Sequence, residues 1–209
     1  MFWCFQMKPK APKSLSQLLC QLRSTISYYR GSSAHSQLQM QLENLNNVPE
    51  HNSLPLGYSI RTYREDDDLH WIRIIQKAFG DNLAELPQIT LKNILIRPDF
   101  DAQSLFFAIY NETPIGTICA LTFSKGQTKT GYIHMVAVCT EHQGKKLGRA
   151  LTLTALQYFK KKGIQKVILD TDDFRIPAIK TYQNLGFKPI YFDVSHKKRW
   201  SKVLKEARK

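Results

Sequence analysis

The spacing of apolar residues changes several times along the chain, and each change predicts a different secondary-structure element. Tyr58–Tyr63 alternates between apolar and polar positions, which predicts a strand. The acidic residues 66–68 then offer helix caps, and the helical spacing that follows predicts a helix running to Phe79. Four residues are expected to form the buried stripe of this helix: Leu69, Ile72, Ile75 and Ala78. We therefore expect the folded domain to begin near Leu56.

The rest of the domain is expected to alternate between strands and helices joined by short connections. In order, the expected elements are a helix at Thr90–Ile96, strands at Leu105–Tyr110, Ile115–Phe123 and Gly131–Val138, a helix at Lys145–Lys162, a strand at Val167–Asp170, a helix at Ile176–Asn184, and strands at Lys188–Asp193 and Arg199–Leu204. The early strands can pair as hairpins, whereas the later strands are joined through helices. This order predicts an α/β (α+β) fold, with a mixed central sheet of six to seven strands and helices on both faces.

Residues 1–55 differ in composition from the rest of the chain. No Asp or Glu precedes Glu43, and the leucine spacing within Ser14–Tyr28 predicts an amphipathic helix. Asn44–Pro55 is polar, carries two prolines and is expected to be a linker. We interpret residues 1–55 as a basic extension to a domain at 56–209. A disordered segment, an organelle transit peptide and upstream sequence from a misassigned start all fit this composition.

Composition narrows the setting in which the protein works. No stretch is apolar over the ~18–20 residues that a membrane-spanning helix needs. The histidines are scattered and the cysteines (Cys4, Cys20, Cys119 and Cys139) lack metal-binding spacing, so we expect no metal site. Unpaired thiols fit a reducing compartment. We expect a cytoplasmic protein, or an organellar one if residues 1–55 are a transit peptide.

The formal net charge of +13 is concentrated towards the C-terminal end of the chain. Residues 197–209 hold seven cations, one acid and Trp200. The cations are Lys197, Lys198, Arg199, Lys202, Lys205, Arg208 and Lys209. Such a segment suits contact with nucleic-acid phosphates, and a solvated charged tail has the same composition.

The most informative segment is 132–148, which reads YIHMVAVCTEHQGKKLG. An apolar strand leads into a polar loop with Gly144 and Gly148, and the loop opens a helix. The first N–H groups of a helix have no internal partner, and the helix dipole makes that end attractive to anions. The segment therefore predicts an anion site, although a tight turn with close helix packing also explains the two glycines.

A second segment, residues 177–187, reads PAIKTYQNLGF. The two segments, in this order, resemble the GCN5-related N-acetyltransferase (GNAT) superfamily. The text from Arg149 to Phe187 is similar to the C-terminal half of mycothiol synthase-like acetyltransferases. The resemblance covers about Leu56–Asp193 and implies a single GNAT domain in which a bulged strand splays from its parallel neighbour. It also implies acetyl-CoA as the co-substrate.

The resemblance places acetyl-CoA on backbone groups of the bulged strand and of the loop that follows. The residues concerned are Val136, Ala137 and Val138, then Gln143, Gly144, Lys145, Lys146, Leu147, Gly148 and Arg149. The pantetheine arm is expected to pair with the strand like an added strand, while the strand's side chains also suit an ordinary core. The family loop pattern, Gln/Arg-x-x-Gly-x-Gly/Ala, matches at Gln143 and Gly148, but Lys146 stands in place of the middle glycine. Arg175 stands where the family often has Asn.

The resemblance also assigns two catalytic roles. Tyr182 is the expected acid, because a phenol can donate a proton to the departing thiolate, whose thiol has a pKa of ~8.5. His134 is the expected base, because an amine nucleophile has to lose a proton. A packed tyrosine and a core histidine remain alternatives. Asp170, Asp172 and Asp173 are expected near the cleft, where they can attract a cationic amine or cap the next helix.

We therefore expect an acetyl-CoA-dependent N-acetyltransferase that acts on a primary amine of a small molecule or a protein, by direct attack in a ternary complex. The alternative is a catalytically weak GNAT-fold binding module that uses its basic surface for nucleic acid or another anionic partner. The sequence carries no pattern that indicates an oligomeric state.

Overall fold

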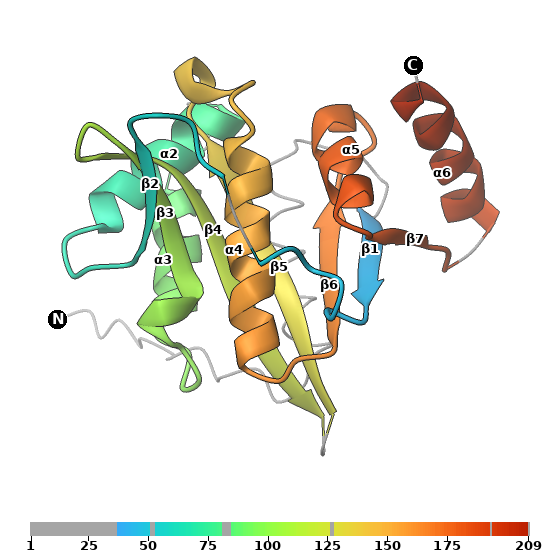
Figure 1. The fold of residues 1–209 in the computed structure, drawn as a ribbon, viewed down its shortest axis with the longest axis horizontal. Coiled ribbons are helices and arrows are strands. Elements are labelled where there is room, and N and C mark those ends of the chain that lie inside the picture. Colours follow the sequence, from blue (N-terminus) through green and yellow to red (C-terminus); the bar gives the residue numbers. More distant parts are fainter. Residues whose placement is uncertain (1–36, 51–52, 81–84, 126–127, 193, 209) are drawn as a thin grey trace, which may run out of the picture.

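The computed structural model describes residues 37–50, 53–80, 85–125, 128–192 and 194–208. Seven strands within these ranges form one sheet in the order β2-β3-β4-β5-β6-β1-β7 (Figure 1). The strands are β1 (Leu38–Glu43), β2 (Tyr58–Thr62), β3 (Leu105–Tyr110), β4 (Thr113–Lys125), β5 (Thr128–Val138), β6 (Lys166–Thr171) and β7 (Lys188–Ile190). The helices are α2 (Asp68–Phe79), α3 (Leu86–Leu95), α4 (Leu147–Lys161), α5 (Ile176–Asn184) and α6 (Val194–Ala207). The expected mixed sheet with helices on both faces is confirmed.

The helices divide between the two faces of the sheet. Figure 1 shows α4 and α5 on one face and α2 and α3 on the other, with α6 beyond β7. The packing of α4 on β5 is tight at Gly131, where an added Cβ would lie 2.9 Å from the Phe159 ring. A side chain at that position would push the helix away from the sheet. The sheet therefore lies between two layers of helices.

The buried face of α2 is rotated from the one expected. Leu69 is 78% exposed, so its assignment to the buried stripe is wrong, whereas Trp71, Ile74 and Ile75 are fully buried. The helix begins at Asp68, and its apolar stripe then runs through Trp71 and Ile75 at the spacing of one turn. Leu69 lies on the opposite side.

Strand β1 was not expected from the sequence. It pairs antiparallel with both β6 and β7, and so lies inside the sheet, although its residues fall within the segment 1–55 that we interpreted as an extension. Leu38, Met40 and Leu42 point into the core, and Leu45 and Val48 of the expected linker are also buried. The folded domain therefore reaches back at least to Leu38. The expected helix at residues 14–28 lies outside the described residues.

The last expected strand, at 199–204, is wrong because this segment is part of α6. The buried residues of α6 are His196, Trp200 and Val203, which recur at the spacing of one helical face. The Trp200 indole Nε1 donates a hydrogen bond to the Ile190 carbonyl at 3.2 Å, which attaches the helix to β7. The segment that we expected to be a strand is thus helical.

The parallel pair β5 and β6 separates partway along its length, as expected. Their pairing runs from Thr130 and Lys166 to Ile133 and Leu169, and both strands continue beyond it. On its other side β5 carries a bulge, where two residues, Met135 and Val136, face one residue of β4. A bulge bends and twists its strand, which accounts for the departure of β5 from β6.

Candidate active site

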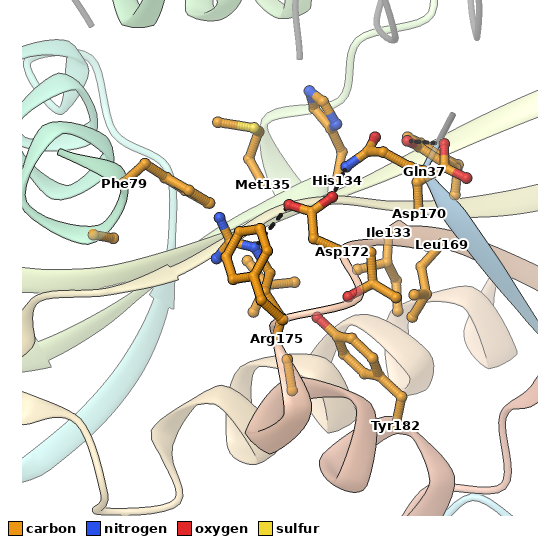
Figure 2. Close-up of a pocket in the computed structure, with 16 residues that line it drawn as sticks. Gln37, Phe79, Ile133, His134, Met135, Leu169, Asp170, Asp172, Arg175 and Tyr182 are labelled. Atoms are coloured by element: carbon orange, nitrogen blue, oxygen red, sulfur yellow. Dashed lines mark hydrogen bonds and ion pairs between the residues drawn. The ribbon is translucent and has the colours of Figure 1, made fainter. Parts of the chain in front are cut away.

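A cavity of about 300 Å³ lies where β5 and β6 separate. Its walls come from α2, the bulged part of β5, the end of β6, the start of α5, and Gln37 just before β1 (Figure 2). Its volume is at the small end of the range for ligand pockets in proteins. Both residues expected to be catalytic, His134 and Tyr182, line it.

Tyr182 reaches the cavity from α5. The helix starts with Pro177 in its first turn, and the Tyr182 ring packs against Phe187 with ring centres 5.9 Å apart. Figure 2 shows its hydroxyl pointing towards the group formed by Asp172 and its neighbours. Burial raises the pKa of Tyr182 to about 12, because the charged phenolate would lose its hydration. The hydroxyl is therefore protonated at neutral pH and available as a donor.

His134 reaches the cavity from β5 and is only 2% exposed. Its ring stacks on Tyr132 at 5.7 Å, and its Nε2 has no hydrogen-bond partner among the described residues. Burial lowers the pKa of His134 to about 3, because the imidazolium would be desolvated. The imidazole is therefore neutral at physiological pH, with one buried nitrogen left to bind a ligand.

A polar wall built by β1 and by Gln37, the residue before it, was not expected. The side-chain amide of Gln37 donates to Asp172 Oδ1 at 2.9 Å, and that of Gln39 donates to Asp170 Oδ1 at 2.8 Å. The Tyr132 hydroxyl donates to the other oxygen of Asp170 at 3.1 Å. Sequence reasoning placed Asp170 and Asp172 near the cleft but missed the glutamines. Asp173, which was expected beside them, does not line the cavity and pairs with Arg199. The alternation of Leu38, Met40 and Leu42 with glutamines was the signal that could have revealed this strand.

Arg175 precedes α5 and extends across the cavity towards α2. Its Nε donates to Asp172 Oδ2 at 3.1 Å, and its guanidinium lies over the Phe79 ring at 4.5 Å. Desolvation lowers the pKa of Arg175 from its usual value, but a guanidinium remains charged at neutral pH. The cavity therefore contains a fixed cation beside two carboxylates.

The loop before α4 has the open geometry of an anion site. Gly144 has φ +76°, Lys146 has φ +61°, and no side chain caps the helix that begins at Leu147. An added Cβ at Gly144 or Gly148 would meet nothing within 4 Å, so a ligand has room to approach this backbone. The first N–H groups of α4 are thus left for an external acceptor.

Two polar side chains of this loop fold back onto it. Gln143 Nε2 donates to the Val138 carbonyl at 3.0 Å, and Lys145 Nζ donates to the Glu141 carbonyl at 2.9 Å. Lys146 and Arg149 do not share this arrangement; Lys146 is exposed and Arg149 is half-buried. The loop is therefore held in shape by its own side chains, and its amide groups form the open surface.

The expected acetyl-CoA site fits this arrangement. After Ile133 the edge of β5 that faces β6 has no strand partner within the described residues, so Val136–Val138 can pair with an extended arm. The open end of α4 lies at one end of this strand, and the cavity with Tyr182 lies along it. The loop can thus hold the phosphates of acetyl-CoA, the strand its extended arm, and the cavity its reactive end.

The described cysteines are poor candidates for a nucleophile. Cys119 and Cys139 are buried free thiols, and burial raises the pKa of both, to about 12 for Cys119. The thiolate is the reactive form of cysteine, and a raised pKa keeps it scarce at neutral pH.

Within the described ranges, no three His, Cys, Asp or Glu side chains gather as ligands for a metal ion. None of the helices that the structure describes has the length and apolar character of a membrane-spanning segment.

Comparisons with known proteins agree on one family. The sequence profile of the acetyltransferase (GNAT) family matches residues 68–187. A mycothiol acetyltransferase from Kytococcus sedentarius is 32% identical over 148 residues, which cover 68% of this chain and 49% of that protein. The chain spans about half the length of the curated relatives it matches.

Two solved structures share the fold. A GCN5-related N-acetyltransferase from Sphaerobacter thermophilus superposes with a TM-score of 0.58 and 17% identity, over 86% of this chain and 55% of that chain. A chain of the NatC complex, solved bound to a Gag peptide and CoA, superposes with a TM-score of 0.55 and 16% identity, over 68% of this chain and 93% of that chain. At this identity the likeness concerns the fold alone.

Proposed function

Because the chain belongs to the acetyltransferase (GNAT) family, we propose that it is an acetyl-CoA-dependent N-acetyltransferase that acts on a primary amine. The observation that carries this proposal is the cavity at the separation of β5 and β6, which both Tyr182 and His134 line. The cavity lies along β5, the strand that leads to the open start of α4. A cavity of about 300 Å³ favours a small-molecule amine over a folded protein as the acceptor. The relative named mycothiol acetyltransferase also favours a small molecule.

In this proposal two parts of the backbone hold acetyl-CoA, which supplies the acetyl thioester. The amides at 144–149 bind its pyrophosphate at the start of α4, where Leu147, Gly148 and Arg149 open the helix. The Gln143 N–H already donates to the Thr140 carbonyl at 3.2 Å, so Gln143 shapes this site through its side chain. The strand edge at Val136–Val138 pairs with its pantetheine arm. The match to the acetyltransferase family supports this choice of co-substrate.

The amine attacks the thioester carbon directly, with both substrates bound in a ternary complex. Tyr182 acts as the acid, because its hydroxyl is protonated and points into the cavity. His134 acts in a narrower way than the sequence led us to expect. A base with a pKa of about 3 does not remove a proton from an alkylammonium of pKa ~10.4, so His134 Nε2 orients an amine that reaches it neutral.

The test is a steady-state assay that follows CoA release by the full-length chain with a panel of small amines. Intersecting initial-rate patterns for the two substrates would support the ternary complex, whereas parallel patterns would indicate a covalent acetyl-enzyme. A folded protein that neither binds acetyl-CoA in calorimetry nor releases CoA with any amine would exclude the proposed activity.

A second candidate function is binding of nucleic acid, or another polyanion, through α6. The structure removes two residues from the expected contact set: Trp200 is fully buried, and Arg199 is paired with Asp173. Four exposed cations remain on the helix, Lys197, Lys198, Lys202 and Lys205, and the exposed Arg208 follows its end. Lys209 lies outside the described residues. The density of positive charge on one face of α6 is the observation that favours binding of a polyanion.

Anisotropy titrations with a labelled oligonucleotide at several salt concentrations test the second candidate. We compare Lys198→Glu/Lys202→Glu on α6 with the charge-matched control Lys92→Glu/Lys129→Glu elsewhere on the surface. Salt-dependent affinity that only the α6 variant loses would support it. Equal losses in both variants would indicate general attraction to a basic protein.

A further inference from the structure

Arg175 is held in the cavity with only part of its hydrogen-bonding capacity used. A guanidinium carries five N–H donors in a planar fork. Asp172 accepts from Nε at 3.1 Å, and no described residue accepts a hydrogen bond from either terminal nitrogen. A cation with a fixed direction and spare parallel donors is the arrangement that proteins use to bind a carboxylate at two points.

Aromatic rings fix the plane of this guanidinium without occupying its donors. Its central carbon lies 4.5 Å from the centre of the Phe79 ring and 5.3 Å from that of Phe174. Contacts of this kind stabilise a cation through the ring face. Figure 2 shows Arg175 between the end of α2 at Phe79 and Asp172. The fork is therefore preorganised in the wall of the cavity, which lowers the entropy lost when a ligand binds.

The same wall offers acceptors for a positively charged or neutral amine. Gln37 donates to Asp172 through its amide nitrogen, and this bond leaves its Oε1 buried with no partner among the described residues. Oε1 can only accept a hydrogen bond. Asp170 adds a second carboxylate to the cavity. Asp172 thus joins a group with spare donors, Arg175, to a group with a spare acceptor, Gln37.

We propose that the acceptor is an amino acid, or a small conjugate with a free amino-acid end, and that Arg175 binds its carboxylate while the amine lies towards Gln37. This inference rests on the proposed function. During transfer the amine nitrogen bonds to the acetyl carbon, the carbon–sulfur bond breaks and its electron pair leaves with sulfur. The proton that the amine loses replaces the one that Tyr182 donates to sulfur, so CoA leaves as its thiol and the carboxylate is unchanged. Arg175 is therefore a specificity-determining residue.

The experiment measures kcat/KM of the full-length protein at saturating acetyl-CoA. After a screen of the common amino acids, the best one is compared with its amide and with its decarboxylated amine. We expect the free carboxylate to raise kcat/KM about 10- to 100-fold, mainly through KM, as for other charge-assisted pairs. Arg175→Gln is expected to reduce the ratio of kcat/KM with and without the carboxylate to near one. Arg175→Lys is expected to restore this ratio partly, because the charge returns without the planar fork of donors. Thermal unfolding of both variants confirms that they are folded.

Several results would overturn the inference. One is an equal kcat/KM with and without the carboxylate; another is a carboxylate preference that survives in Arg175→Gln. A further measurement compares acetyl-CoA with succinyl-CoA as the acyl donor. An Arg175-dependent preference for succinyl-CoA would assign the guanidinium to the acyl group and overturn an acceptor role.

The outcomes also separate this inference from the proposed function. Turnover of amines without carboxylate discrimination overturns the inference alone. Absence of acetyl-CoA binding and of all turnover overturns both. If acetyl-CoA binds without turnover, the amino acid and its amide are titrated into the CoA-loaded protein by calorimetry. Tighter binding of the amino acid, lost in Arg175→Gln, supports the inference. Equal binding of the two compounds overturns it.

Discussion

Gln39 Nε2 donates a hydrogen bond to Asp170 Oδ1 at 2.8 Å, across 131 residues of the chain. This bond joins β1 to the strand that ends at the cavity. It makes the N-terminal strand a part of the site as well as a part of the sheet. The first prediction follows from this placement.

We expect a truncated protein that begins at Leu56 to lack a stable fold. The truncation removes β1, the strand that pairs with both β6 and β7. The measurement is thermal unfolding followed by circular dichroism, with acetyl-CoA calorimetry on the same protein. A cooperative transition and normal binding in the shortened chain would contradict the prediction.

A milder change in the same strand is Met40→Ala. Met40 is fully buried, so we expect a loss of about 2–4 kcal/mol in the free energy of unfolding, measured with urea. Glu43→Ala is the matched control at the exposed end of the strand. Its loose pair with Lys166, at 3.8 Å, predicts a change within about 0.5 kcal/mol.

Tyr182→Phe is expected to lower kcat about 100-fold with little change in stability, because it removes the donor and keeps the ring packed on Phe187. Tyr191→Phe, at an exposed tyrosine outside the cavity, is the control. The Tyr182 pKa of about 12 also predicts no loss of activity from its ionisation up to pH ~10. A variant with near-normal kcat would remove Tyr182 from the mechanism.

His134 is expected to make the protein acid-sensitive. Its pKa is about 3 in the folded protein, against ~6.5 when unfolded, so between these values the unfolded chain binds a proton that the folded protein does not. The free energy of unfolding should therefore fall as pH falls below ~6.5, by up to about 1.4 kcal/mol per pH unit, with no such loss above it. Urea titrations between pH 7.5 and 4.5 should show a smaller slope for His134→Gln. Equal slopes would contradict the shift.

Lys146→Gly is expected to raise the free energy of unfolding by about 1 kcal/mol, because Lys146 has φ +61°, a conformation that costs an L-residue energy and glycine little. Lys146→Ala keeps the strain and removes only the charge. We expect both variants to bind acetyl-CoA at least as tightly as the natural chain. A tenfold loss of affinity in both would show that the Lys146 cation contacts a phosphate.

The elements that the sequence predicted well are those with local signals. α5 has the expected bounds, Ile176–Asn184, because Pro177 marks its start and Gly186, with φ +93°, follows its end. β1 carried a local signal too, but its partners lie more than 120 residues away and no local pattern indicates them. The segment 199–204 is too short to separate a strand from a helix by periodicity, which explains the wrong assignment there.

The features of the candidate site also divide into those with a local sequence signal and those without one. Tyr182 and the loop at 143–148 follow from motifs. The structure places Tyr182 in the cavity at the separation of β5 and β6, and the loop between the end of β5 and α4. The contact of Arg175 with Phe79 joins two elements through tertiary packing alone, so it could not be read from the chain. The low pKa of His134 was equally hidden, because it depends on complete burial.

The position of β1 also sets the order of events during synthesis on the ribosome. At ~5–20 residues per second, about 7 to 26 s pass between synthesis of Gln39 and of its partner Asp170. During that time an alternating segment with Leu38 and Met40 has no strand to pair with. When β6 emerges, its edge stays open until this early segment inserts. Closure of the sheet is therefore a late, long-range step, and the nascent chain exposes an aggregation-prone strand that a chaperone can protect.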